Sequence, residues 1–337
     1  MSLARMVPTA VLVGIMALVI TPVAVALFKM GPQSQSSTTA KKSATTAKPA
    51  KLAGFDGDRA YQYLVEQCDM GARTSGSENN RKLRKRMSEH FESQGAKVTL
   101  QTFEVPHPLN GEPVEMENVV ASWFPDRTKR VVIGAHFDTR PRPDKEPTAK
   151  RRAQPFYGAN DGASGIAVLM ELANMMNDLK TTVGVDLVAF DGEELVWDEG
   201  GRVSGEFFEG SMHFAKQYQQ AQRSGSQSRY VAGIVVDMVG GNVLRILPDK
   251  RGKREAPQLV QEIWSVARRL KATGFKSDGE YDVSDDHWPL LDAGIPAIDI
   301  IDFSYKHWHL TTDTADKCSA ASLAQTGGVV AEWLRGK

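Results

Sequence analysis

Two adjacent glutamates at the end of an apolar run are the residues of this chain best suited to do chemistry. Asp191 to Glu194 reads Asp-Gly-Glu-Glu, and it directly follows the apolar run 185–190. The run predicts a buried strand that delivers these acidic residues at its carboxyl edge. Burial of an unpaired carboxylate is very costly. Glu193 and Glu194 therefore predict a cation held at this edge.

Four further clusters of acidic residues and histidines follow hydrophobic runs or lie near turns. They are His136-Phe137-Asp138, Asn160-Asp161, Asp237 after Val236, and His309 after Trp308. Together with Glu194 they offer nitrogen and oxygen ligands without sulfur, a set that zinc accepts and that manganese or cobalt could also use. The five candidate ligands exceed what one tetrahedral zinc needs. Either two metals bind, or one binds and the other groups orient its ligands.

Two residues of these clusters are suited to roles beside the metal. If Glu194 binds the metal, Glu193 can face the open coordination position. Neighbouring carboxylates and partial burial would raise its pKa toward the working range of a general base. Asp138 follows His136 by two positions and shares its side of an extended chain, so it is suited to orient that histidine.

Alternating strands and helices must position these residues. The apolar pattern predicts strands at 97–105, 116–123, 130–135, 185–190, 230–237, 243–247 and 296–301. It predicts helices over 58–70, 77–94 with Ser77 as the cap, a segment after the glycine-rich turn 158–165, 211–222, 257–271, 285–293 and 320–333. This alternation predicts an α/β fold, a single domain with a mostly parallel twisted central sheet flanked by helices.

The candidate ligands are placed where such a sheet binds its ligands. Ligand sites of open α/β sheets lie beyond the carboxyl ends of the strands, and the acidic and histidine clusters follow the predicted strand ends. The segment 139–157 is rich in Pro, Arg and Lys and has no periodicity. We therefore expect it to form a loop that overhangs the site.

The first residues of the chain predict a segment outside the folded domain. After a short tail at 1–5, residues 6–28 are nearly all apolar and without charge, long enough to span a bilayer. They form either an uncleaved transmembrane signal anchor or a cleaved signal peptide ending near Ala24-Val25-Ala26. Residues 29–54 are rich in Ser, Thr, Lys and Pro and predict a flexible linker. The catalytic domain, 55–337, would then be membrane-anchored outside the cytoplasm, or secreted or periplasmic.

Composition bounds the remaining possibilities. The formal net charge is zero, so nothing indicates a nucleic-acid partner, and the membrane is reached only through the N-terminal segment. The two cysteines, Cys68 and Cys318, lie far apart and exclude a cysteine zinc site. They are either buried small hydrophobic residues or, in an exported domain, a disulfide.

The motifs resemble those of a known enzyme superfamily. They are Phe190-Asp191-Gly192-Glu193-Glu194, the turn 160–165, Asp237-Met238-Val239-Gly240, Asp285-Asp286-His287 and Trp308-His309. Their order resembles the M28 metallopeptidase superfamily over roughly residues 55–335. The Phe-Asp-Gly-Glu-Glu form, Trp197 after it, and Trp directly before the last histidine look closest to the glutaminyl-peptide cyclotransferases, or glutaminyl cyclases.

The resemblance implies a role for each matched residue. In such cyclases one zinc is held by the matches of Asp161, Glu194 and His309, and the match of Glu193 transfers protons. Asp237 and Asp285 match acidic residues hydrogen-bonded near the site, and Trp308 and Trp197 match indoles of the pocket wall. In the aminopeptidases of the superfamily, the matches of His136 and Asp237 hold a second zinc, with that of Asp161 bridging.

The resemblance leaves two activities toward peptide or protein N-termini. As a cyclase, the enzyme would convert N-terminal Gln to pyroglutamate and release ammonia. As an aminopeptidase with one or two zinc ions, it would use Glu193 to activate water against the first peptide bond. Asp299 stands where animal cyclases carry His, which bears on substrate preference. A third reading is an inactive tethered binding domain, and the complete ligand set with Glu193 argues against it.

Overall fold

A computed structural model describes residues 50–337. The predicted tail, the apolar segment 6–28 and nearly all of the linker lie outside the described residues. Among residues 50–337, no helix has both the length and the apolar character needed to cross a membrane.

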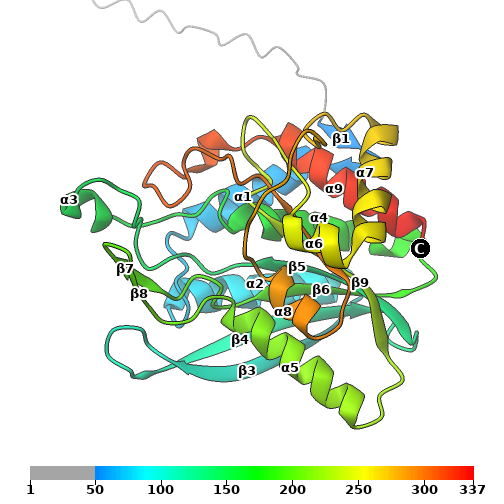
Figure 1. The fold of residues 1–337 in the computed structure, drawn as a ribbon, viewed down its shortest axis with the longest axis horizontal. Helices are drawn as coiled ribbons and strands as arrows, with labels where there is room; N and C mark the ends of the chain where they lie inside the picture. The colour runs from blue at the N-terminus through cyan, green and yellow to red at the C-terminus, as the bar shows by residue number, and fades with distance from the viewer. Residues whose placement is uncertain (1–49) are drawn as a thin grey trace, which may run out of the picture. The chain divides into compact units, whose positions relative to one another are not determined.

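A six-stranded sheet forms the centre of the described domain (Figure 1). Its strands are β3 (Lys97–Pro106), β4 (Pro113–Trp123), β5 (Lys129–His136), β6 (Gly184–Phe190), β9 (Arg229–Asp237) and β10 (Ala297–Ile301), in the spatial order β10-β9-β5-β6-β4-β3. The four strands from β10 to β6 are parallel, and β4 and β3 are antiparallel. The mostly parallel sheet is therefore confirmed, with an antiparallel edge.

The parallel register brings the functional strand ends to one edge of the sheet. His136, the last residue of β5, pairs with Phe190, the last residue of β6. Asp237 at the end of β9 pairs with Ile301 at the end of β10. The four strands thus terminate side by side, and the segments that leave them share one crevice.

Helices cover both faces of this sheet (Figure 1). One face packs into a large apolar core with α1 (Gly57–Asp69), α2 (Glu78–Ser93), α4 (Ala163–Leu179), α7 (Pro257–Leu270) and α9 (Ala320–Arg335). The other face packs against α5 (Glu209–Arg223) and α8 (His287–Asp292). The short helix α6 (Lys250–Glu255) lies near β10. Strands buried from both sides explain why their sequences read as continuous apolar runs.

Local signals explain where several helices begin. The Ser77 side chain accepts a hydrogen bond from the backbone N–H of Asn80, so it caps α2 as predicted. Ser319 caps α9 in the same way, through the N–H of Ser322. Pro257 stands in the first turn of α7, where its missing N–H costs nothing.

The structure also differs from the expected elements. The segment 243–247 forms only an isolated bridge between Ile246 and Phe275, and Val243 is 84% exposed, so the predicted strand there is wrong. The expected linker included residues 51–54, which belong to a small hairpin. Short elements were not expected: β1 (Lys51–Leu52), β2 (Phe55–Asp56), β7 (Trp197–Glu199), β8 (Arg202–Ser204), α3 (Ala149–Arg152) and the 3-10 helix Ala315–Lys317. Both cysteines are free.

Candidate active site

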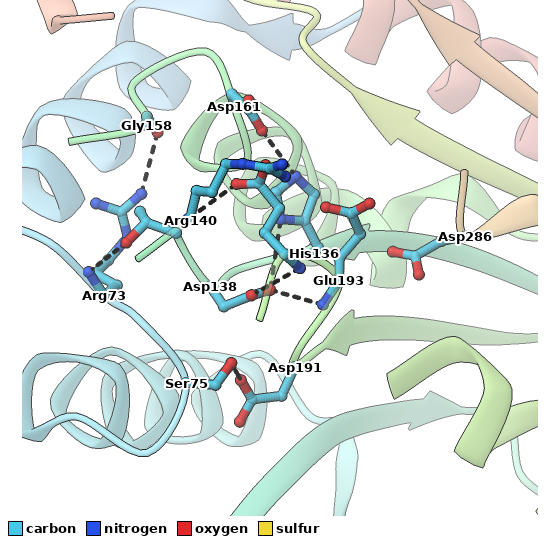
Figure 2. Close-up of polar contacts among 12 residues, drawn as sticks. Arg73, Ser75, His136, Asp138, Arg140, Gly158, Asp161, Asp191, Glu193 and Asp286 are labelled. Carbon is cyan, nitrogen blue, oxygen red and sulfur yellow. Dashed lines mark hydrogen bonds and ion pairs between the residues drawn. The ribbon is translucent and has the colours of Figure 1, made fainter. Parts of the chain in front are cut away.

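The predicted ligands meet beyond the carboxyl ends of the parallel strands. His136 ends β5 and Asp237 ends β9, while Glu194 lies just after β6. Asp161 lies in the turn before α4, and His309 lies in the loop after β10. Figure 2 shows His136, Asp161 and Glu193 converging from these separate segments.

One cluster joins Asp161, Glu194 and His309. A ligand atom of each lies within 4.8 Å of the other two, and all three side chains are buried. His309 Nε2 lies 2.9 Å from Glu194 Oε1 and 3.5 Å from Asp161 Oδ2. Asp161 Oδ2 has no hydrogen-bond partner among residues 50–337. A buried carboxylate oxygen without a donor, beside a second carboxylate and an imidazole, is suited to a cation.

A second cluster shares Asp161 with the first. The ligand atoms of His136, Asp161 and Asp237 also lie within 4.8 Å of one another. His136 Nε2 is 3.2 Å from Asp237 Oδ1 and 3.3 Å from Asp161 Oδ1. Gly162 allows this close approach, because a Cβ there would lie 2.5 Å from the His136 ring. Asp161 is thus placed where it could bridge two cations.

Asp138 makes its main hydrogen bonds with the Glu193–Glu194 segment and not with His136. Its carboxylate accepts hydrogen bonds from the backbone N–H groups of Glu193 (3.1 Å) and Glu194 (3.0 Å) (Figure 2). The distance from Asp138 Oδ1 to His136 Nδ1 is 3.6 Å, longer than a hydrogen bond. The expected orienting contact is therefore weak, and the main partners of Asp138 are the two glutamate amides.

A loop between α1 and α2 supports the site from behind, and the sequence pattern did not reveal it. The buried Arg73 guanidinium donates to the carbonyl oxygens of Tyr157 (2.8 Å) and Gly158 (3.1 Å), just before Asp161. Ser75 Oγ donates a hydrogen bond of 2.8 Å to Asp191, the first residue of the Asp-Gly-Glu-Glu segment. Figure 2 shows this loop reaching both segments. It fixes the turn of Asp161 relative to the glutamates.

Arg140 and Asp144 are two further site residues that sequence reasoning missed. The Arg140 backbone N–H donates to Glu194 Oε2 at 3.0 Å, and its guanidinium pairs with Asp144 at 2.7 Å. Asp144 Oδ1 lies 3.0 Å from His309 Nδ1. Both residues belong to the loop 139–157, which does reach over the site as expected. Only their charges, within a loop expected to lie over the site, could have indicated from the sequence that Arg140 and Asp144 belong to it.

A cavity of about 450 Å³ opens onto the clusters. Asp161, Glu193, Glu194, Asp237, Asp285 and His309 contribute to its lining. Trp308 lines it too, together with four aromatic residues that were not predicted: Phe207, Phe208, Trp288 and Phe303. Trp197, the other expected wall, is not among the lining residues. It lies in β7, where the Arg142 guanidinium sits 4.0 Å from the centre of its ring.

Comparison with known proteins agrees with this geometry. The sequence profile of peptidase family M28 matches residues 118–334, most of the described domain. The chain belongs to peptidase family M28. A glutaminyl-peptide cyclotransferase-like protein of Mus musculus is 25% identical over 287 residues, which cover 78% of this chain and 71% of that protein.

Solved structures similar to this M28 protein include two kinds of enzyme. The crystal structure of Fimbriiglobus ruber glutaminyl cyclase is 40% identical, with a TM-score of 0.81, and the match covers 86% of this chain and 99% of that one. A leucine aminopeptidase precursor from Bacteroides thetaiotaomicron is 28% identical, with a TM-score of 0.77, covering 84% and 98%.

The electrostatics of this M28 site favour a bound cation. Burial and the Glu194 carboxylate raise the pKa of Asp161 to about 6. Burial acts to raise the pKa of Glu194 as well, but His309 and Arg140 outweigh it and hold the pKa at about 2. Burial acts to lower the pKa of His309, but Glu194 and Asp144 raise it to about 9. Two buried carboxylates so close together favour a positive charge between them, and a dication would supply it. The donor set fits a metal.

Glu193 differs from its neighbour Glu194 in its environment. Burial raises the pKa of Glu193 well above the usual range; His136 opposes the shift, and the Glu194 and Asp285 carboxylates add to it. Two adjacent carboxylates whose environments separate their pKa values are suited to different tasks, one as a ligand and one as a proton acceptor.

Acidic residues extend behind the cavity. Asp285 Oδ1 accepts a hydrogen bond of 2.5 Å from the backbone N–H of Asp286, and Asp299 is buried in the last strand, β10. Burial and the Asp285 carboxylate raise the pKa of Asp299 well above its usual value. Neither oxygen of the buried Asp299 carboxylate has a hydrogen-bond partner among residues 50–337.

Proposed function

We propose that this M28 protein is a zinc-dependent glutaminyl-peptide cyclotransferase. It would convert the N-terminal Gln of a peptide to pyroglutamate and release ammonia. The observation that carries the proposal is that Glu193 and the Asp161–Glu194–His309 cluster face one aromatic-walled cavity of about 450 Å³. Such a cavity has room for the N-terminal residue of a peptide. The 40% identity with a structure named as a glutaminyl cyclase supports it.

Zinc would be held by Asp161, Glu194 and His309. When bound there, zinc supplies Lewis acidity that polarises the side-chain amide carbonyl of the substrate. His136 and Asp237 would hold a second ion or, if one ion binds, would orient Asp161, which lies 3.3 Å from His136.

Glu193 would move the proton of the reaction. The α-amine of the substrate attacks the δ-carbon of the Gln side chain, and Glu193 accepts a proton from that amine. The bond between the δ-carbon and the amide nitrogen then breaks, and Glu193 delivers the proton to the departing ammonia. Its raised pKa suits both steps, since the group must take up and release a proton near neutral pH.

The remaining residues would bind and orient the substrate. Asp237 and Asp285 line the cavity with acidic groups, which favour the amine end of a peptide. Trp308 and the other aromatic walls exclude water, which would otherwise compete with the amine as nucleophile.

The second cluster favours an aminopeptidase as the alternative. His136, Asp161 and Asp237 lie close enough together to act as ligands of a second metal, and two-metal sites occur in aminopeptidases. In that reaction Glu193 would accept a proton from the water that attacks the first peptide bond. The similarity to a leucine aminopeptidase precursor supports this alternative.

The cellular setting is part of the proposal. Residues 6–28 would act as a signal anchor or a cleaved signal peptide, so the domain would meet peptide and protein N-termini outside the cytoplasm.

Mass spectrometry of two peptides separates the activities. The purified protein, loaded with zinc, is given one peptide that begins with Gln and one that begins with Leu. Loss of ammonia from the Gln peptide, with the Leu peptide intact, is the expected result. Release of the first residue from either peptide would establish the aminopeptidase. No change in either peptide would contradict both activities and favour a binding domain.

A further inference from the structure

A second hollow adjoins the active-site cavity. It has a volume of about 270 Å³ and lies between α5 and α8. Phe208 and Trp288 line both this hollow and the active-site cavity. The two spaces therefore share walls. We name the second hollow the α5–α8 groove.

Both walls of the α5–α8 groove are attached to the catalytic segments. The backbone N–H of Phe208 donates to the carbonyl oxygen of Glu193 at 3.2 Å, and that of Trp288 donates to the carbonyl oxygen of Asp285 at 2.8 Å. Ser211 Oγ donates to Asp286 Oδ1 at 2.5 Å, which joins α5 to the start of α8. In Figure 2, Asp286 lies on the side of Glu193 away from Arg140. An occupant of the groove would thus be held in register with the catalytic glutamate.

The groove is apolar beside the cavity and polar at its far end. Met212, which is 38% exposed, lines this part of the groove, and Ala215 and Pro289 add apolar surface. At the far end, Gln219 Nε2 donates to the carbonyl oxygen of Asp292 at 3.4 Å and joins the two helices. Side chains that enter from the cavity therefore meet apolar surface first.

The length of the groove suits a few residues of extended chain. Met212 and Gln219, which line the groove from α5, are seven positions apart on that helix, a rise of about 10 Å at 1.5 Å per residue. An extended peptide rises about 3.3 Å per residue, so roughly three to four residues would fit.

We propose that the α5–α8 groove binds the residues that follow the N-terminal residue of a peptide substrate, and that it favours apolar side chains at positions two and three. The occupant is the continuing peptide because the rest of a substrate must leave the cavity, and the groove borders the cavity at Phe208 and Trp288. The inference rests on the proposed function in so far as the substrate is a peptide.

Two Gln peptides test the preference. The amides Gln-Leu-Phe and Gln-Ser-Ser are compared by kcat/KM for ammonia release. The wild-type protein is expected to prefer Gln-Leu-Phe by about tenfold, since one buried apolar side chain contributes about that factor. In Met212→Glu the ratio of the two kcat/KM values should fall toward one, because the introduced carboxylate would lie against the apolar side chains of the peptide Gln-Leu-Phe. The matched control is Gln220→Glu, on the exposed side of the same helix with the same change of charge, and it should keep the wild-type ratio.

A binding experiment separates this inference from the proposed function. The pyroglutamyl-Leu-Phe amide is titrated into the protein while the methionine methyl groups are followed by NMR, with Met212 assigned through Met212→Glu. Met238 lines the active-site cavity and Met212 the groove, so each reports its own space. Shifts of both signals support the groove, even if no Gln peptide is cyclised. A shift of Met238 alone, no shift of either up to millimolar peptide, or a wild-type ratio near one would overturn it.

Discussion

The Asp138 carboxylate accepts a hydrogen bond of 3.0 Å from the backbone N–H of Glu194, so a buried acid fixes the segment that carries a candidate metal ligand. Its other oxygen accepts from Glu193 at 3.1 Å. In Asp138→Asn the carboxamide NH₂ would face one of these N–H groups. We expect zinc affinity to fall about 10- to 100-fold, measured by competition with a chromophoric chelator. The exposed control Asp126→Asn should bind zinc normally. An unchanged affinity in Asp138→Asn would mean that Asp138 does not position Glu194.

Glu193→Gln should separate proton transfer from metal binding. The amide keeps the size of the side chain but cannot accept the proton, so kcat should fall by about 10²- to 10⁴-fold. Zinc content and melting temperature should stay near those of the wild type, because Asp161, Glu194 and His309 are unchanged. Glu199→Gln, on the exposed tip of the β7–β8 hairpin, is the control. Full turnover by Glu193→Gln would exclude it as the general base.

The sequence predicted the buried strands better than the short exposed elements. β5, β6 and β9 are covered on both faces, so their apolar runs stood out against polar loops. The segment 243–247 has a similar apolar content, but Val243 is 84% exposed. Hydrophobicity alone does not say whether a short run is paired. The three-residue strands β7 and β8 are too short to show any period.

The site was predictable where its residues follow strand ends, and less so where tertiary contacts decide. Asp161, Glu194 and His309 were named as candidate ligands because they follow apolar runs or lie near turns, and the structure brings the three together. Arg73 contacts Gly158 across 85 positions of the chain, and no local pattern reports such a contact. The aromatic residues of the cavity wall could not be predicted for the same reason. Trp288 lines the cavity and Trp197 does not, and only the tertiary packing distinguishes them.

A pH-dependent contribution to stability should come from His90, remote from the metal ligands. His90 Nε2 lies 2.8 Å from the carbonyl oxygen of Met170, and burial lowers its pKa below 6.5. The unfolded state therefore takes up a proton first as the pH falls. The contribution is complete above about pH 6.5 and is lost as the pH falls through the folded pKa, by up to about 1.4 kcal/mol per pH unit.

The variant His90→Gln isolates this contribution, because its amide can still donate to Met170 but does not titrate. Urea unfolding of both proteins between pH 5 and 8 measures the effect. The free energy of unfolding of the wild type, relative to that of His90→Gln, should decrease as the pH falls. A difference independent of pH would contradict the assignment to His90.

Metal removal should lower stability as well as activity. Without a cation, the buried carboxylates of Asp161 and Glu194 face each other, and burial raises the pKa of Asp161 to about 6. Zinc at about 1,000 times its Kd would stabilise the fold by about 4 kcal/mol. Treatment with a chelator should lower the melting temperature, and added zinc should restore it. An identical melting temperature with and without zinc would contradict a metal held by these residues.

The number of metals can be counted on the same samples. If His136 and Asp237 hold a second ion, the wild type binds two zinc ions per chain and His136→Ala binds one. If they only orient Asp161, both proteins bind one ion, the variant more weakly. Elemental analysis after gel filtration gives the ratio of zinc to protein.

Arg73 should prove essential to both the fold and the metal site. Its guanidinium is fully buried and donates to the carbonyl oxygens of Gln67, Gly71, Tyr157 and Gly158. In Arg73→Met these carbonyls lose their donor, and each unsatisfied buried group costs about 1–3 kcal/mol. We expect a loss of about 3 kcal/mol or more in urea unfolding of the metal-free protein. The exposed Arg81→Met is the control.

The effect of Arg73 on zinc distinguishes positioning from general stability. Gly158 lies three positions before Asp161, so freeing its carbonyl should loosen the turn that presents the Asp161 carboxylate. Zinc affinity of Arg73→Met, measured at a temperature where it is folded, should therefore fall. Arg73→Lys should recover only part of both losses. The ammonium group can still donate to some of the carbonyl oxygens, but it cannot reach all the positions that the planar guanidinium reaches. If Arg73→Met loses stability but binds zinc as the wild type does, Arg73 supports the fold without positioning Asp161.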